Sequence, residues 1–249
     1  MTEAPVTAAV LVIGNEILSG RTKDANLPYL GERLGELGIR LAEARVIPDV
    51  EAEIVAAVNA LRTRYTYVFT TGGIGPTHDD ITAACVAAAF GRPLIRNPEA
   101  LALLQAHYAP GDLNEARLRM ANTPDGASLI ENPISHAPGF RIENVHVMAG
   151  VPAVMRAMFE GLAPGLTGGP PLRSRSLTSK LPEGAIAAGL GAVQARYPEV
   201  DIGSYPSFRD GRPSVAVVLR ATDEPRLAAA AEEVAALIRD LGAEPGETG

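Results

Sequence analysis

The chain has 249 residues, of which 47% are hydrophobic and 20% are charged. This size and composition predict a globular protein of one large domain, alone or with a small companion, and exclude a disordered chain. The net charge of −7 argues against a nucleic-acid-binding surface, which needs clustered Lys and Arg. The single cysteine, Cys85, excludes an internal disulfide and a cysteine-based zinc cage.

The N-terminal segment predicts no membrane anchor. Its first apolar run, residues 6–13, is too short to span a bilayer, and no basic segment precedes it. We therefore expect a cytoplasmic protein that binds neither a membrane nor nucleic acid.

Strands and helices are expected to alternate along the first two thirds of the chain. Apolar runs predict strands at residues 6–13, 39–46, 65–70 and 145–148, and helical spacing predicts helices at 26–37, 51–61, 81–90, 98–108, 114–120 and 153–162. Residues 123–140, rich in Pro, Asn and Gly, predict a long ordered loop or a hairpin. Such alternation predicts βαβ units and a mostly parallel sheet, with ligands bound beyond the carboxyl ends of its strands.

A second, smaller domain is expected at the C-terminal end. Residues 161–171 hold four glycines and three prolines, which predicts a linker. The pattern after it predicts strands at 173–181, 200–208 and 214–221, helices at 183–197 and 227–241, and a turn at 209–212. We therefore expect an α/β domain at residues 1–165 and a small α+β domain at residues 172–249.

The most informative segment runs from Thr71 to Asp80 and reads Thr-Gly-Gly-Ile-Gly-Pro-Thr-His-Asp-Asp. Glycines between a strand and a helix allow backbone N–H groups to bind a phosphate. The two carboxylates, Asp79 and Asp80, favour a phosphate held through a divalent cation such as Mg²⁺, Mn²⁺ or Co²⁺. The alternative is a tight turn in which Thr77 and Asp80 form a capping box. His78 is a candidate phosphate contact or general base.

Two further motifs, Gly14-Asn15-Glu16 and Gly150-Val151-Pro152, follow other strand ends. In a functional interpretation, four carboxylates converge on one metal ion or water: those of Glu16, Asp24, Asp79 and Asp80. In the alternative, Asp24 caps the helix that begins near Asn26, and Glu16 is solvated. Among the remaining histidines, His136 is a candidate pocket residue, whereas His107 and His146 are expected in packing or at the surface.

These motifs resemble the molybdopterin-binding fold shared by MoaB, MogA, MoeA and the N-terminal domain of CinA. The segment Gly203-Ser204-Tyr205-Pro206 and the small C-terminal domain are similar to CinA-type proteins and to the molybdopterin-binding-like domain of eukaryotic FAD synthases. The resemblance implies a three-layer α/β/α sandwich with a mostly parallel sheet, and a homo-oligomer, either a dimer or a trimer. Two positions depart from the pattern: Asn15 stands where molybdenum-cofactor proteins often have Asp, and Ala149 replaces a Pro.

The resemblance also implies a chemistry. Asp80 falls on the key acidic residue of the family, which supports metal-dependent adenylyl transfer to molybdopterin in the cofactor-making members. The CinA and FAD synthase branch implies metal-dependent hydrolysis of the pyrophosphate in ADP-ribose or FAD. The chain ends before the amidohydrolase domain of full-length CinA, so we expect no deamidation of nicotinamide mononucleotide.

We therefore predict a divalent-metal-dependent nucleotide pyrophosphatase. Asp80 and Asp79 are the predicted catalytic residues, and the predicted metal ligands are these two with Glu16 and Asp24. The predicted substrate-binding and phosphate-binding residues are Gly14, Asn15, Glu16, Asn26, Thr71, Gly72, Gly73, Gly75, Pro76, Thr77, Gly150 and Pro152. The alternatives are molybdopterin binding or adenylylation, with molybdopterin as the ligand, and a non-catalytic nucleotide-binding module. In the small domain, Tyr205 is expected either to pack its strand or to reach a base or ribose.

Overall fold

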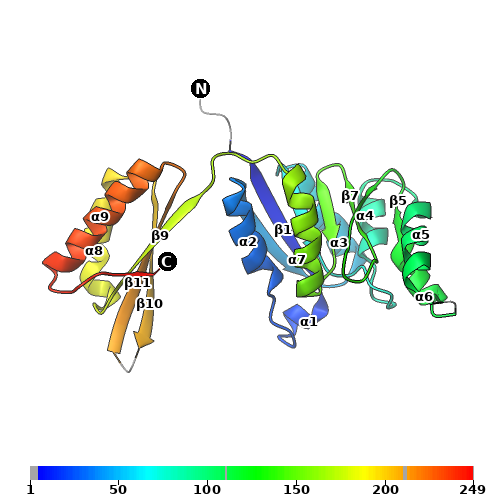
Figure 1. Cartoon of the computed structure of the whole chain (residues 1–249), viewed down its shortest axis with the longest axis horizontal. Helices are drawn as coiled ribbons and strands as arrows, with labels where there is room; N and C mark the ends of the chain where they lie inside the picture. Colours follow the sequence, from blue (N-terminus) through cyan, green and yellow to red (C-terminus); the bar gives the residue numbers. More distant parts are fainter. Residues whose placement is uncertain (1–4, 110, 210–211, 249) are drawn as a thin grey trace. The chain divides into compact units, whose positions relative to one another are not determined.

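The computed structural model describes residues 5–109, 111–209 and 212–248. The chain forms two compact units, residues 1–169 and 170–249 (Figure 1). The segment expected to be a linker, 161–171, begins inside helix α7 (Pro152–Leu162) and continues through a 3-10 turn, η2 (Ala163–Gly165). Each unit has its own hydrophobic core.

A six-stranded sheet forms the centre of the first unit, in the order β2-β1-β3-β8-β7-β6. Its strands are β1 (Thr7–Ile13), β2 (Arg40–Ile47), β3 (Tyr67–Thr71), β6 (Ser128–Ile130), β7 (Gly139–Ile142) and β8 (Val145–Met148). β1 pairs in parallel with β2 and β3, and β3 pairs in parallel with β8, whereas β7 runs antiparallel to both of its neighbours. The expected mostly parallel sheet is confirmed.

Helices cover both faces of this sheet (Figure 1). Leu30 and Leu34 of α2 (Asn26–Glu36) share one core cluster with Phe159 of α7. Ile54 of α3 (Glu51–Arg62) and Val86 of α4 (Thr82–Ala89) share the cluster on the other face. The helices pack in this way because their apolar residues recur at helical spacing and form one apolar face, which each helix buries against the sheet. The three-layer α/β/α sandwich is thus confirmed.

Short elements flank the sandwich, some of them unexpected. The helices are α1 (Asn15–Leu18), α5 (Pro98–His107) and α6 (Glu115–Leu118), with a 3-10 turn η1 (Arg119–Ala121), and the strands are β4 (Leu94–Arg96) and β5 (Asn122–Pro124). β4 and β5 pair with each other in a separate two-stranded sheet. The region expected to be a loop or hairpin, residues 123–140, therefore includes β6, most of β5 and the start of β7.

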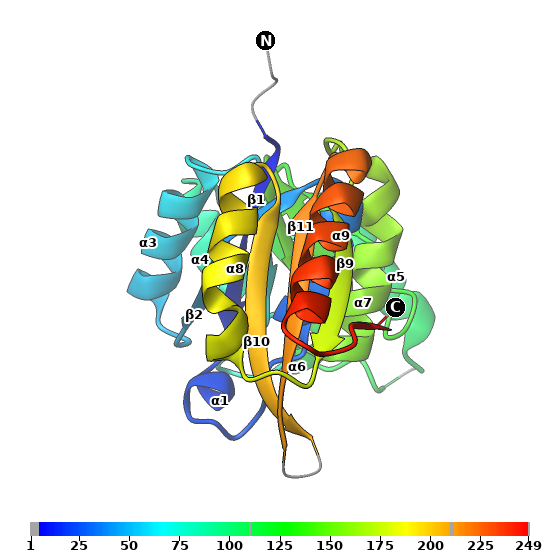
Figure 2. The same cartoon turned by 90° about the vertical axis from the view of Figure 1, so that its left-hand side faces the viewer.

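The described residues of the second unit form β9 (Arg173–Ser179), α8 (Glu183–Arg196), β10 (Asp201–Arg209), β11 (Arg212–Ala221), α9 (Glu224–Asp240) and β12 (Gly246–Thr248). Its sheet has the order β10-β11-β9-β12, with every pair antiparallel. Both helices lie on one face of the sheet (Figure 2). This is the βαββαβ arrangement of ferredoxin-like domains. The expected α+β domain is present, with β12 as an additional strand; residues 210 and 211 of the expected 209–212 turn lie outside the described residues.

The strand order of the first sheet has a topological switch point between β1 and β3. β1 lies between β2 and β3, so the chain leaves β1 towards one side of the sheet and returns on the other. In such sheets, ligands bind beyond the carboxyl ends of the strands at this switch point. Among the described residues, no helix is long and apolar enough to cross a membrane.

Candidate functional site

The glycine segment that follows β3 fits tightly between β1 and the start of α4. Gly72 has a φ of +104°, and a Cβ at this position would overlap the carbonyl oxygen of Ile13. Gly73 has a φ of +68°, and a Cβ there would overlap the hydroxyl of Thr82. That hydroxyl donates to the carbonyl oxygen of Gly72 at 3.0 Å. Only glycine fits both positions, because a side chain would meet a neighbour in a backbone conformation that other residues rarely adopt.

The same segment presents free backbone donors. Within the described parts of the chain, the N–H groups of Gly73, Ile74 and Gly75 form no hydrogen bond. The segment leads directly into α4, whose N-terminal end carries a partial positive charge. Free N–H groups beside a helix start are a favourable site for an anion.

The acidic pair lies in a turn just before α4. One oxygen of Asp80 accepts hydrogen bonds from the backbone N–H of Thr77, at 2.8 Å, and from its hydroxyl. The capping-box interpretation therefore has the expected partners, but the helix begins at Thr82, so these bonds close a turn that precedes it. Hydrogen bonding by Thr77, and then by its own backbone N–H, lowers the pKa of Asp79, which is ionised at neutral pH.

His78 extends into solvent beside this pair. Its side chain is 95% exposed, and its Nδ1 lies 3.9 Å from a carboxylate oxygen of Asp79. It is accessible to a ligand, and no protein contact fixes it above the glycine segment.

The motif after β1 lies at the same edge of the sheet. The N–H of Gly14 donates to the carbonyl oxygen of Ile47 at 3.1 Å, and the N–H of Asn15 donates to a carboxylate oxygen of Asp49 at 2.9 Å. The side chain of Glu16 folds back over Gly14, since a Cβ on Gly14 would be 2.6 Å from both Glu16 carboxylate oxygens. This motif is thus anchored to the end of β2 as well as to β1.

Asn26, the first residue of α2, contacts the third motif. Its side-chain amide donates to the carbonyl oxygen of Gly150 at 2.8 Å, and the residue is only 4% exposed. Gly150 in turn lies against Gly72, because a Cβ on Gly150 would be 3.2 Å from the Gly72 Cα. The structure therefore brings Asn26, Gly150 and Gly72 together, and α7 begins at Pro152, two residues after Gly150.

The four carboxylates expected to converge do not form one cluster. Asp24 accepts from the N–H groups of Asn26, at 3.3 Å, and Leu27, at 2.8 Å, and so caps the start of α2. Glu16 lies over Gly14, and Asp80 closes its own turn. Among the described residues, no three His, Cys, Asp or Glu side chains are grouped closely enough to hold a metal ion. The hydrogen bonds of Asp24 to the start of α2 and of Asp80 to Thr77 hold these two carboxylates in separate places.

Two buried oxygen atoms at this edge lack partners. Neither Oδ1 of Asn26 nor Oγ1 of Thr71 has a hydrogen-bond partner among the described residues, and Thr71 is 1% exposed. An unsatisfied buried polar group costs about 1–3 kcal/mol. Such groups are rare in folded proteins, and a ligand that supplies the missing bond is one explanation.

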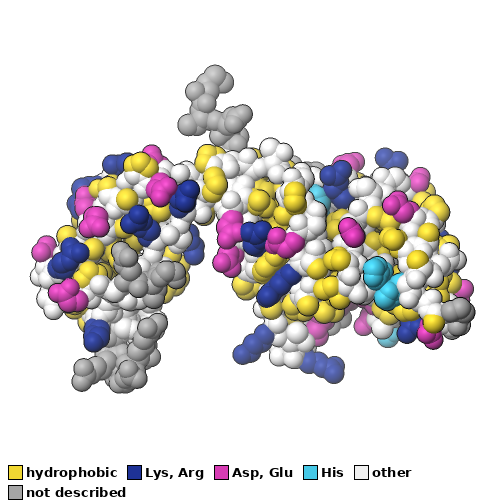
Figure 3. Space-filling view, in the orientation of Figure 1, with side chains coloured by type: hydrophobic (Ala, Val, Ile, Leu, Met, Phe, Trp, Pro, Cys, Tyr) yellow, Lys and Arg dark blue, Asp and Glu magenta, His cyan; other side chains and the backbone are white. Residues whose placement is uncertain are grey.

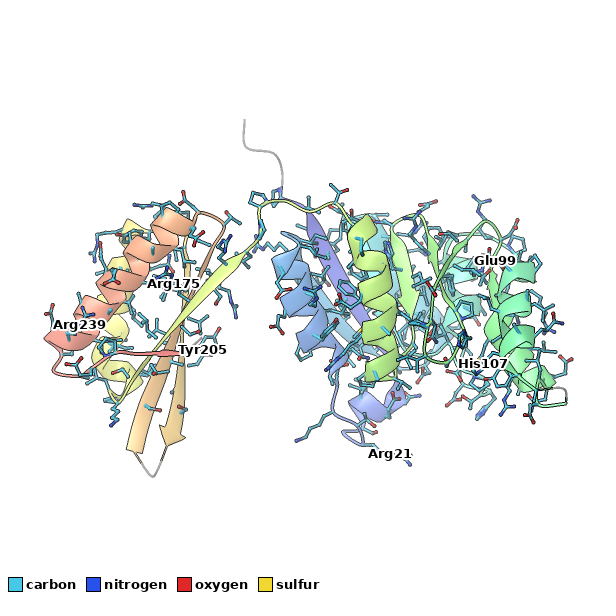
Figure 4. All side chains as sticks on the ribbon, in the orientation of Figure 1. Arg21, Glu99, His107, Arg175, Tyr205 and Arg239 are labelled. Atoms are coloured by element: carbon cyan, nitrogen blue, oxygen red, sulfur yellow. The ribbon has the colours of Figure 1, made fainter. Side chains whose placement is uncertain are left out.

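Several charged residues near the site were not singled out from the sequence. Asp49 anchors Asn15, and the guanidinium of Arg119 donates to the carbonyl oxygen of Pro76 at 2.9 Å. Arg21 and Lys23 lie exposed in the segment between α1 and α2, and Arg21 is labelled in Figure 4. Asp49 could have been recognised from the sequence, because it follows the end of a strand as the three motifs do. No feature of the sequence pointed to Arg119.

The other residues noted from the sequence lie away from this edge or form no part of it. His136 and His107 are both exposed and stack with ring centroids 4.6 Å apart; His107 is labelled in Figure 4, and Figure 3 shows a histidine surface on this side of the unit. His146 is buried. In the second unit, Tyr205 is 52% exposed, and its ring lies over Gly203 (Figure 4).

Both parts of the chain match families of known proteins. Residues 9–168 match a family described as "Probable molybdopterin binding domain", and residues 171–244 match the middle domain of FAD synthase. A protein of Aeropyrum pernix is 36% identical over 95% of this chain and 92% of its own length. A CinA-like protein of Citrifermentans bemidjiense is 38% identical over 91% of this chain, which spans 56% of that protein.

A solved structure is also similar to this chain. The crystal structure of CinA from Thermoplasma acidophilum superposes with a TM-score of 0.62 at 33% identity, covering 65% of this chain and 98% of that one. The chain therefore belongs to the molybdopterin-binding-domain family and is a CinA-like member of it.

Proposed function

We propose that the protein is a divalent-metal-dependent pyrophosphatase that acts on a nucleotide such as ADP-ribose or FAD. The observation that carries this proposal is the pairing of free backbone N–H groups at Gly73 to Gly75 with two carboxylates, Asp79 and Asp80, at the switch point of the sheet. A site for phosphate alone gains nothing from adjacent negative charges. A site for phosphate with a cation needs them.

The glycine segment would hold the phosphate groups. Its free N–H groups can donate to non-bridging oxygens, and the start of α4 adds a favourable dipole. The exposed cations Arg21 and Lys23 can attract the anionic substrate to this edge. Binding in this way orients one phosphorus atom for attack by water, which breaks its bond to the bridging oxygen and leaves two monophosphates.

The residues present fit a magnesium-like ion. Mg²⁺ in phosphate-binding sites uses one or two carboxylates together with substrate phosphate oxygens and water, so a cage of three protein carboxylates is not required. Asp80 and Asp79 would hold the ion, and the unpartnered oxygens of Asn26 and Thr71 offer further neutral acceptors to the ligand. When bound, the cation polarises the phosphoryl group and lowers the pKa of its water.

The substrate class is supported by the second unit. It resembles the middle domain of FAD synthase, a protein named for a dinucleotide that contains a pyrophosphate bond. ADP-ribose contains the same linkage between an adenosine and a ribose. Both substrates release AMP on hydrolysis, so one assay covers them.

Asp80→Asn tests the proposal with little change in shape. The asparagine keeps a side-chain oxygen for the N–H of Thr77 but removes the charge that the cation needs. We expect AMP release to fall by at least about 100-fold, the effect of losing a few kcal/mol of cation binding and charge stabilisation. Glu99→Gln, an exposed change of the same kind on α5 (Figure 4), should leave the rate unchanged. Equal rates for Asp80→Asn and wild type would overturn the assignment.

A second candidate is molybdopterin binding or adenylylation. The family description and the two unpartnered oxygens favour it, because a pterin ring carries several hydrogen-bond donors. Titration with molybdopterin would show tight binding that Asn26→Ala weakens. If the protein binds a nucleotide but releases no AMP with any divalent metal, it is instead a non-catalytic nucleotide-binding module.

A further inference from the structure

A cavity of about 400 Å³ lies in the first unit, apart from the glycine segment. It is lined by residues of β6, β7 and β8 and by the C-terminal end of α7 with the turn that follows. His146 is the second residue of β8, whereas Gly150, at the proposed nucleotide site, lies two residues beyond the last residue of that strand. Cavities that hold small ligands have volumes from about 300 Å³ upwards.

Three polar side chains form a row across the base of this cavity. Arg141 pairs with His146 between β7 and β8, and with Ser128 between β6 and β7. Directly opposed residues on antiparallel strands project from the same face of the sheet. All three residues line the cavity. The row therefore offers a hydroxyl, a guanidinium and an imidazole to one occupant.

The burial of His146 is costly unless something binds to it. The residue is 3% exposed, and its Nδ1 has no hydrogen-bond partner among the described residues. Its ring packs against Phe69 and Tyr67, at centroid distances of 5.0 and 5.9 Å. A phenylalanine would keep this packing and avoid the cost of about 1–3 kcal/mol for an unsatisfied nitrogen. Packing alone therefore does not account for a histidine at this position.

The charges around the row favour an anion of low charge. Arg141 takes part in none of the ion pairs found in the described part of the first unit. Burial, and then the nearby Arg141 cation, lowers the pKa of His146 to about 4, so the imidazole is neutral and carries one N–H. Glu131 also lines the cavity. Its negative charge would repel a ligand that carries a second negative charge, and its carboxylate can accept hydrogen bonds from hydroxyl groups of the ligand.

We propose that this cavity binds a small hydroxylated molecule through one oxyanion group, a phosphate or a carboxylate, held by Ser128, Arg141 and His146. Each of the three residues donates to the oxyanion, and Arg141 supplies the charge. The hydroxyl groups of the ligand face Glu131. The site is separate from the proposed nucleotide site, and its occupancy does not depend on a divalent metal.

Isothermal titration calorimetry of the full chain with glycerol 3-phosphate and with glycerate tests the proposal, because these probes differ in their oxyanion. We expect at least one to bind, and Arg141→Gln and His146→Phe each to weaken that binding by at least about tenfold. Arg40→Gln serves as the matched control, since Arg40 is an exposed arginine on β2 at the opposite edge of the sheet. The tighter probe identifies the oxyanion.

Three outcomes would overturn the proposal. One is no heat of binding for either probe, a second is unchanged binding in Arg141→Gln, and the third is displacement of the probe by a nucleotide. Saturating ADP-ribose with Mg²⁺ should not displace the probe, and displacement would assign the binding to the nucleotide site. Because Arg141 is exposed, its substitution keeps the fold and the test remains decisive even if His146→Phe is unstable.

Discussion

At the scale of single residues, backbone geometry makes the strongest demand at Gly72. Alanine there would combine an unfavourable φ with overlap of the Ile13 carbonyl oxygen. Gly91 also has a positive φ, +61°, but a Cβ added there would have no neighbour within 4 Å. We expect Gly91→Ala to cost about 1 kcal/mol of unfolding free energy and Gly72→Ala clearly more. Urea denaturation measures both, and equal costs would show that the Ile13 contact is easily relieved.

The burial of His146 predicts a pH dependence of stability. Its folded pKa of about 4 lies below the usual histidine value of 6.5, so the unfolded chain binds the proton more tightly between these values. Stability is therefore full above about pH 6.5 and falls as the pH drops towards 4, by about 3 kcal/mol at most for this shift. In His146→Phe this contribution is absent. In thermal unfolding from pH 7 to pH 4, the midpoint of the wild type should fall by more than that of His146→Phe, and parallel curves would contradict the assigned burial.

The sequence was sufficient for some site residues and insufficient for others. The turn that Asp80 closes with Thr77 could be predicted, because its partners are three residues apart in the sequence. The contact of Gly72 with the Ile13 carbonyl oxygen and the unpartnered oxygen of Asn26 could not, since they depend on residues 59 and 124 positions away. The expected cluster of four carboxylates was wrong for a different reason: local hydrogen bonds hold Asp24 and Asp80 in separate places.

At the scale of elements, the start of α2 provides a separate test for Asp24. Its carboxylate accepts from the first N–H groups of that helix, as Asp223 accepts from the N–H of Arg226 at the start of α9. Replacing either residue with alanine should cost about 1 kcal/mol of stability. If Asp24 is only a cap, both variants keep metal-dependent activity. If Asp24→Ala, but not Asp223→Ala, needs a higher metal concentration for half-maximal activity, Asp24 belongs to the cation site.

Long, periodic elements were predictable, and short ones were not. The helix at 51–61 and the strand at 6–13 each agree with the structure within one residue at either end. β4, β5 and β6 have three residues each, too few to show an alternation of apolar and polar positions. Their pairing is set by long-range contacts, as is that of β12 with β9.

At the scale of the whole molecule, the cores predict two folding units. The clusters around Ile54 and Leu30 lie within the first unit, and the cluster around Leu190 lies within the second. We expect residues 5–169 and 170–248, produced separately, each to unfold cooperatively, because each retains its buried apolar surface. Far-ultraviolet circular dichroism with urea checks this. A non-cooperative transition in either fragment would show that its core needs the other unit.

In the proposed function, the glycine segment and the acidic pair hydrolyse a nucleotide pyrophosphate with a divalent metal. The most direct measurement is AMP release from ADP-ribose and from FAD by the wild-type chain, with Mg²⁺, Mn²⁺ or Co²⁺ and with EDTA. We predict that AMP and ribose 5-phosphate form in equal amounts from ADP-ribose, or AMP and FMN from FAD, only when metal is present. Intact substrate under all three metals, from protein that still binds it, would contradict the account.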